Sequence, residues 1–264
     1  MSSVKQVDSV RAYWNSRAGL GRWAGTRDLI AKELELKTLA EFVRPGMKVL
    51  DAGCGNGVAA IELARRFEVD ITAIDYAAEM VGAASQTAAM EPLVGTIQFR
   101  EGDVTHLSDL ARDLPRDFDL IYTERVIINL PDWETQKKAI AELTGLLRVG
   151  GVYAMLENSQ DGLDKINALR EQVGLQPVVA PWHNRYLKDS ELQALSIPGV
   201  TLERVIFHSS TYYFLSRVVN AWLAAREGKE PDYDSPVNEL ALQLPAIGDL
   251  GQGRVWVWKR LTSD

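Results

Sequence analysis

Short apolar runs alternate with segments of helical periodicity through the first 160 residues. The run MKVLDAG follows a Pro-Gly turn and predicts a buried strand, and VAAIELARRF directly after it places Ile61, Ala64 and Phe67 at helical spacing. Three further strands are predicted, over Asp70–Asp75, Thr96–Asp103 and Phe118–Glu124. Strand, turn and helix therefore follow one another in repeated order, which is typical of a parallel sheet covered by helices on both faces.

The next helix is predicted to begin at Pro131 and Asp132. Its apolar stripe includes Ile140, Leu143 and Leu147, and we expect Gly150–Gly151 to end it before a strand over VYAMLE. Beyond residue 160 the pattern predicts a helix near Asp161–Val173, a strand near Leu202–His208 and a last strand over RVWVWKR.

Two segments lie outside this alternation. The N-terminal RAYWNSRAGLGRWAG and the helix behind it, through Leu36, Leu39 and Val43, are predicted to cap the sheet edge. The insertion FLSRVVNAWLAAR before the last strand predicts a helix that forms a lid or an oligomer contact, with one apolar face made by Leu215, Val218, Val219 and Trp222. We expect one domain, 1–264, with a cap (1–45), a donor-binding core (46–160) and substrate-side elaborations with the last strands (161–264).

Composition narrows the classes of function. The formal charge of −7 disfavours a nucleic acid or an anionic membrane surface as partner. No apolar run is long enough to span a bilayer and the start lacks the pattern of a signal peptide, so we expect a cytoplasmic protein. Cys54 is the only cysteine, which leaves neither an internal disulfide nor a thiolate metal site, and we expect no metal.

The sequence VLDAGCGNG carries the strongest chemical signal. Asp51, Gly53, Gly55 and Gly57 follow the pattern D-x-G-x-G-x-G where the first strand meets its helix. Glycines allow a sharp turn and a close approach of backbone to ligand, and the helix start offers free N–H groups. The alternating glycines and the preceding acid differ from the dinucleotide fingerprint, because Asp51 would repel a pyrophosphate but pair with a cationic amino group.

At these residues the chain resembles the class I S-adenosylmethionine-dependent methyltransferases. The resemblance implies a Rossmann-like α/β fold with a seven-stranded, mostly parallel sheet, an antiparallel last strand, an N-terminal helical cap and a C-terminal insertion before the last strand. It also implies that S-adenosyl-L-methionine is the methyl donor and S-adenosyl-L-homocysteine the product. Asp75 matches the acid that holds the ribose hydroxyls, with Tyr76 next to the adenine, and Asp103 and Val104 match the position at the adenine edge.

The same resemblance extends to the cap and to the segment after the fourth strand. In YWNSRAG, Tyr13 or Trp14 would cover the donor and Arg17 would meet its carboxylate. Glu124 and Arg125 begin the stretch that lines the methyl-transfer site in such enzymes. The remaining residues implied on the donor side are Cys54, which also fills the turn as a small side chain, and Met80.

For the acceptor, the residues favour a small polar or anionic metabolite or a glycan. His183 titrates near neutrality and is a candidate general base, and Arg125, Arg185 and Arg217 are candidates for an anion pocket. We therefore expect O-methylation, with Arg125 and His183 on the acceptor side.

Three alternatives stay open. Glu124 and the acidic composition would suit N-methylation of a small amine. A donor-binding module without catalysis, or a partner-binding scaffold that uses the Leu215–Trp222 helix, for instance as a homodimer, is an alternative of another class. An NAD-dependent oxidoreductase is disfavoured because Asp51 precedes alternating glycines.

Overall fold

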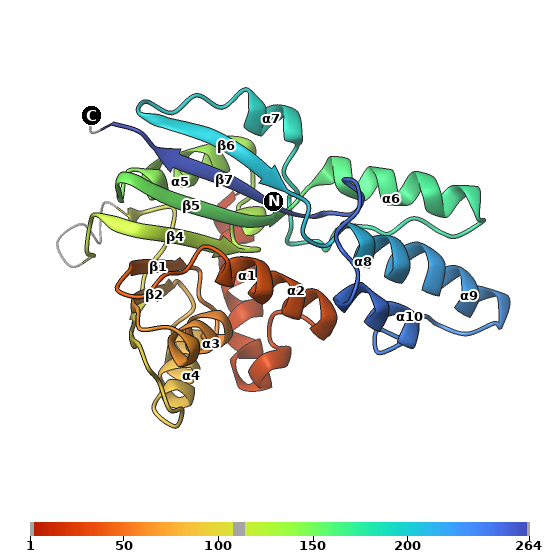
Figure 1. Ribbon diagram of the computed structural model, residues 1–264, viewed down its shortest axis with the longest axis horizontal. Coiled ribbons are helices and arrows are strands. Elements are labelled where there is room, and N and C mark those ends of the chain that lie inside the picture. Colours follow the sequence, from red (N-terminus) through yellow and green to blue (C-terminus); the bar gives the residue numbers. More distant parts are fainter. Residues whose placement is uncertain (1–2, 108–113, 263–264) are drawn as a thin grey trace.

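The computed structural model describes residues 3–107 and 114–262 and contains a seven-stranded sheet (Figure 1). The strand order is β3-β2-β1-β4-β5-β7-β6, and β7 runs antiparallel to β5 and β6. The strands are β1 Lys48–Ala52, β2 Asp70–Asp75, β3 Thr96–Glu101, β4 Phe118–Glu124, β5 Leu147–Asn158, β6 Val200–Ile206 and β7 Gly253–Arg260. The predicted mostly parallel, Rossmann-like sheet with an antiparallel last strand is confirmed.

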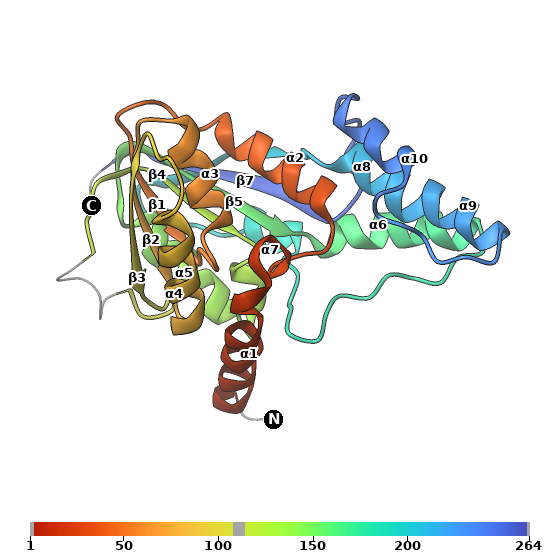
Figure 2. The ribbon, with the colours of Figure 1, turned by 90° about the horizontal axis from the view of Figure 1, so that it is seen from below.

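Helices cover both faces of this sheet, as Figure 2 shows. Buried side chains of α2 and α3 pack on one face, and those of α5, α6 and α7 belong to the cluster on the other. The α-helices are α1 Ser3–Arg17, α2 Leu29–Ala40, α3 Val58–Arg66, α4 Ala78–Ala88, α5 Trp133–Thr144, α6 Gln160–Gln172, α7 Asp189–Gln193, α8 Ser210–Phe214, α9 Ala221–Arg226 and α10 Pro236–Glu239.

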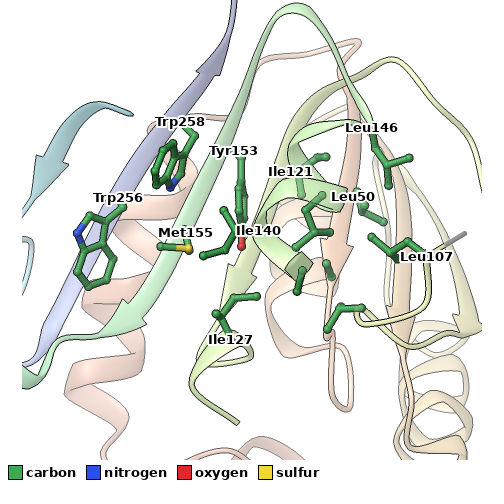
Figure 3. Close-up of a cluster of buried hydrophobic side chains, with 14 of the residues drawn as sticks. Leu50, Leu107, Ile121, Ile127, Ile140, Leu146, Tyr153, Met155, Trp256 and Trp258 are labelled. Carbon is green, nitrogen blue, oxygen red and sulfur yellow. The ribbon is translucent and has the colours of Figure 1, made fainter. Parts of the chain in front are cut away.

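The two cores follow from the alternation of side chains along each strand. On β7, Trp256 and Trp258 pack on the face shown in Figure 3, with Tyr153 and Met155 of β5. Val255 and Val257 point to the opposite face. Because both faces are buried, the central strands are apolar almost throughout and polar residues concentrate at their ends.

The predicted boundary between the fifth helix and the fifth strand is wrong. Helix α5 ends at Thr144, and Leu147 belongs to β5 rather than to the helix stripe. Gly150 lies inside β5 with φ +80° beside a register shift against β4, so the glycine pair marks an irregular stretch of strand and not the end of a helix.

The insertion departs from a regular helix. Residues Leu215–Asn220 form a π-helix between α8 and α9, which changes the direction of each side chain after it. Val218 is therefore buried while Trp222 is 38% exposed, so the predicted single apolar face does not form. Figure 1 shows α8, α9 and α10 beside α6, beyond the carboxyl end of β5.

The N-terminal cap lies over a cavity, as the resemblance implied for Tyr13 and Trp14, and not over the sheet edge. Helix α1 and the 3-10 helix Ala18–Trp23 contact α4, and the Asn15 side chain accepts a hydrogen bond from the Glu79 backbone N–H. Residues of this segment line the cavity at the carboxyl ends of the strands, so the cap covers that cavity instead of the sheet edge.

Candidate functional site

The site begins at the turn between β1 and α3. Gly53, Gly55 and Gly57 all have positive φ, of +86°, +53° and +81°, a backbone conformation that side chains disfavour. At Gly53 a side chain is also excluded sterically, because a Cβ there would lie 2.3 Å from Cγ2 of Val126. At Gly55 nothing lies within 4 Å of the corresponding position, so the turn has open space on that side.

Asp51 lies at the end of β1 and is almost fully buried. Its Oδ2 accepts a hydrogen bond of 2.7 Å from the Tyr122 hydroxyl. Burial raises the pKa of Asp51 to about 7, although the Tyr122 bond and Lys32 act in the opposite sense. A cationic ligand group beside this carboxyl would favour its ionised form.

Asp75, at the end of β2, ties two backbone segments together. Its Oδ2 accepts from the Gly55 N–H at 2.8 Å and its Oδ1 from the Ala77 N–H at 2.9 Å. Burial raises the pKa of Asp75, and these two hydrogen bonds oppose that shift. The carboxylate thus fixes the glycine turn while it lines the same cavity.

Beyond β3, the Asp103 carboxylate accepts hydrogen bonds from the backbone N–H and the hydroxyl of Thr105. Val104, Tyr76 and Met80 line the same cavity. Arg11 of the cap lies over the Tyr76 ring, 5.2 Å from its centroid. The structure therefore brings the predicted ribose-side and adenine-side residues to one cavity.

Aromatic rings join the cap to the loop after α6. Tyr13 and His183 have ring centroids 4.7 Å apart, and Trp14 and Trp182 pack edge-on around His183. Burial and Arg17 both lower the pKa of His183, so its ring is neutral at pH 7. In the described part of the chain the buried Nδ1 of His183 has no hydrogen-bond partner.

Arg17 does not line the cavity. Its guanidinium donates to the carbonyls of Ala24 and Trp23 and lies 5.4 Å from the Tyr13 ring centroid. The structure places it as a brace for the cap segment; its role toward a donor carboxylate stays a prediction.

Four charged side chains meet where the cap crosses the end of β4. Lys32 contacts both carboxylate oxygens of Glu124 at 2.5 Å, and Nη2 of Arg125 lies 3.1 Å from Glu124 and 3.5 Å from Glu35. Burial raises the pKa of Glu35 to about 8, whereas Lys32 and Arg125 outweigh burial at Glu124 and hold its pKa well below its usual range. At pH 7 Glu35 is thus the protonated member.

Because Glu35 is neutral and Glu124 is ionised, we expect a small loss of stability when the charge of Glu35 is removed and a large loss when Glu124 loses its cationic partner Lys32. Glu35→Gln keeps the neutral form and should change the free energy of unfolding by less than about 1 kcal/mol at pH 6. Lys32→Met leaves Glu124 short of its partner in a buried place and should cost about 3 kcal/mol. Urea denaturation of both variants measures these changes in the free energy of unfolding.

The pH dependence gives an independent check. Because the folded pKa of Glu35 is raised, the folded chain binds more protons than the unfolded chain between about pH 4.5 and 8, so this group's contribution to stability falls as pH rises through that window. The Gln variant should lose less stability than the unaltered chain between pH 6 and 9. Parallel curves for the two proteins would contradict the assignment.

Arg125 is held in an unusual backbone conformation. Its φ is +58°, rare for a residue with a side chain. The next three backbone N–H groups, of residues 126–128, donate to the buried carboxylate of Glu157 at the end of β5, at 3.0–3.3 Å. Glu157 thereby sets the turn that carries Arg125 and that places Val126 against Gly53.

These features surround one cavity of about 980 Å³, near the upper end of small-molecule sites. All predicted site residues except Arg17 and Arg185 line it. The predicted anion pocket of three arginines does not form, because Arg185 lies outside the cavity and its guanidinium binds Gln136 and Glu191. Sequence reasoning missed Lys32, Tyr186, Tyr213 and Tyr233 in the lining, and Glu35 and Glu157 behind it, because their helices and loops carry no motif.

Two further findings concern the described residues alone. No group of three or more His, Cys, Asp or Glu side chains among them is arranged to hold a metal ion. None of the helices in the described ranges is long and apolar enough to cross a membrane.

Comparison with known proteins agrees with this geometry. A family model described as a methyltransferase domain matches residues 49–151. Phosphoethanolamine N-methyltransferase 3 of Arabidopsis thaliana is 34% identical over 106 residues, 37% of this chain and 20% of that protein. Ubiquinone biosynthesis O-methyltransferase of Xanthomonas campestris is 33% identical over 112 residues, 42% of this chain and 43% of that protein. The chain thus spans less than half the length of these relatives, whose names include both N- and O-methylation.

A solved structure extends the likeness to the whole fold. The magnesium protoporphyrin IX methyltransferase of Synechocystis PCC 6803, crystallised with bound SAH, superposes with a TM-score of 0.60 at 19% identity, covering 96% of this chain and 99% of that one. At this identity the likeness shows the fold and leaves the acceptor open.

Proposed function

We propose that the chain is a class I S-adenosylmethionine-dependent methyltransferase and that it methylates an oxygen of a small polar or anionic metabolite or glycan. The methyltransferase domain model matched at residues 49–151 and the shared fold support this proposal. The observation that carries the proposal is the set of carboxyls at the ends of neighbouring strands. Asp51, Asp75 and Asp103 line one cavity around an open glycine turn. This arrangement suits an adenosine-bearing sulfonium with an ammonium group.

The residues fit such a donor. Asp75 would accept hydrogen bonds from the ribose hydroxyls with the lone pairs left after Gly55 and Ala77, and Asp51 would hold the ammonium group. Tyr76 and Met80 would flank the adenine, with Asp103 and Val104 at its edge. Tyr13 and Trp14 would exclude water from above. When bound, the donor supplies an electrophilic methyl group on a positively charged sulfur.

On the acceptor side the protein must orient the nucleophile and, where the nucleophile is protonated, accept its proton. An oxyanion needs orientation alone, while a hydroxyl needs a base. We assign the neutral His183, whose buried Nδ1 has no hydrogen-bond partner among the described residues, as the base for a hydroxyl acceptor. Glu124, which favoured an amine acceptor from the sequence, already binds Lys32 through both oxygens, so the structure lends N-methylation less support.

A labelled-methyl assay tests the proposal. The purified chain is given S-adenosylmethionine labelled in its methyl group and a panel of hydroxyl, carboxylate, phosphate and amine acceptors. We expect label in oxygen acceptors, and for hydroxyls we expect His183→Gln to lower kcat about a hundredfold. Donor binding without transfer to any acceptor or cell-extract compound would instead favour the non-catalytic donor-binding module.

The raised pKa of Asp51 makes donor binding pH-dependent. Near pH 6 the carboxyl is mostly protonated, and contact with a cationic donor favours its ionised form, so binding releases a proton and tightens as pH rises through 7. We expect up to about tenfold tighter binding at pH 8 than at pH 6. Calorimetry in two buffers of different ionisation enthalpy measures both the affinity and the proton release.

Asp51→Asn provides the control, since it keeps the size of the side chain without the titrating group. Its affinity should be weaker and nearly constant over this pH range. An unaltered chain with pH-independent donor affinity would contradict the placement of Asp51 beside the ammonium.

A further inference from the structure

Part of the cavity lining comes from the insertion and from the cap. We call this region the acceptor compartment and define it by the cavity-lining residues Lys32, Arg125, Tyr186, Tyr213, Arg217 and Tyr233. The residues come from α2, the turn after β4, the loop before α7 and the insertion. The shared methyltransferase domain match covers residues 49–151, so most of these residues lie outside it.

Charge is divided between the two ends of the cavity. The donor end presents the carboxyls of Asp51, Asp75 and Asp103. Around the acceptor compartment the lining contains Lys32, Arg125 and Arg217, three cations, against two carboxylates, Asp28 and Glu124. A local excess of positive charge in a chain of net charge −7 indicates an anionic ligand group.

Arg125 offers unpaired N–H groups to this compartment. Only its Nη2 has carboxylate partners, Glu124 and Glu35, and no described residue hydrogen-bonds its Nε or Nη1. The side chain is 23% exposed and so open to the cavity. Each of these free N–H groups can donate a charge-assisted hydrogen bond to an oxygen of a carboxylate or phosphate.

Arg217 is fixed in place beside it. Its Nη2 binds Asp28 at 2.6 Å and its Nη1 binds the Ser216 hydroxyl, while the guanidinium lies 5.3 Å and 4.8 Å from the ring centroids of Tyr213 and Tyr233. The π-helix that carries Arg217 is a feature often found at functional sites. These tyrosine faces already hold a cation, which leaves them unsuited to an ammonium group of a ligand.

The tyrosine hydroxyls complete the compartment. Burial raises the pKa of Tyr186, and a hydrogen bond with the Asn158 side chain opposes that shift. Arg125 and Arg217 oppose it as well, and all three side chains line the same cavity. Burial also raises the pKa of Tyr213, and Arg217 acts against it there too. A phenol remains protonated here and can donate a hydrogen bond to an anion.

We propose that the acceptor carries an anionic group, a carboxylate or phosphate oxyanion, that binds in the acceptor compartment to the unpaired N–H groups of Arg125, with Arg217 and the Tyr186 and Tyr213 hydroxyls around it. This inference rests on the proposed function, because the methyl donor defines which end of the cavity remains for the acceptor. It excludes a simple cationic amine from the compartment.

Matched probes test the charge requirement. The full chain, with and without saturating S-adenosylhomocysteine, is titrated calorimetrically with benzoate and phenyl phosphate and with their neutral counterparts, benzamide and phenol. We expect each anion to bind at least about tenfold more tightly than its neutral counterpart. Comparison of the two anions shows whether carboxylate or phosphate is preferred.

Arg125→Gln should abolish that preference while leaving S-adenosylhomocysteine binding within about threefold, which also shows that the variant is folded. Arg65→Gln is the matched control, because Arg65 is an exposed arginine on α3 outside the cavity, and it should behave as the unaltered chain. Anions that bind no better than their neutral counterparts, or equally well to the Arg125 variant, overturn the inference. If the unaltered chain does not bind S-adenosylhomocysteine, that result counts against the proposed function. The titrations of the anions without S-adenosylhomocysteine still test the anion site in that case.

Discussion

Replacement of Asp75 by Ala should weaken binding of S-adenosylhomocysteine at least a hundredfold. The variant loses the carboxylate proposed for the ribose hydroxyls, and it also leaves the Gly55 and Ala77 N–H groups without their acceptor. Hydrogen bonds to a charged group contribute about 1.5–3 kcal/mol each, so loss of two corresponds to a factor of about a hundred or more. Isothermal titration calorimetry measures the effect.

Asp70→Ala is the control, since Asp70 begins the same strand at its opposite end and is exposed. It should bind S-adenosylhomocysteine as the unaltered chain does. An Asp75→Ala protein that is folded, judged by circular dichroism, and that retains full affinity would show that Asp75 does not contact the ligand.

The second large effect is expected at Gly53. In Gly53→Ala the new methyl would lie 2.3 Å from Val126, whose backbone N–H is held by Glu157, and the residue would keep a φ of +86°. Backbone strain of about 1–2 kcal/mol and overpacking of about 1–3 kcal/mol together should lower the free energy of unfolding by about 3 kcal/mol. Urea denaturation measures this loss.

Gly46→Ala separates the cost of backbone strain from the cost of overpacking. Gly46 has a similar φ of +80°, but nothing lies within 4 Å of the place that a Cβ would take there, so it should show the backbone strain alone. The double variant Gly53→Ala, Val126→Ala should recover stability toward the Gly46→Ala value. Equal losses in the two single variants would contradict the contact between the glycine turn and Val126.

The fold was largely predictable because the strands that carry it are buried on both faces. Apolar runs that end in an acid predicted the bounds of β2 and β4 to the residue, and the alternation of Val and Trp predicted β7. The end of α5 was not predictable from Gly150, because a glycine with positive φ serves an irregular strand as well as a helix end.

The donor half of the site was predictable for a related reason. Asp51, Asp75 and Asp103 sit at the ends of adjacent parallel strands, which must converge at one sheet edge. The acceptor half depends on contacts between segments far apart in sequence, such as Lys32 with Glu124 and Asp28 with Arg217. A π-helix shifts the side-chain periodicity without any sequence signal, so the place of Arg217 follows only from the structure.

The assignment of the cavity depends most directly on whether the unaltered chain binds the donor. Titration calorimetry of the purified chain with S-adenosylmethionine and with S-adenosylhomocysteine should give saturable heat and one molecule bound per chain. Neither heat nor a shift in melting temperature with either compound would contradict the conclusion that this carboxylate-lined turn holds the methyl donor.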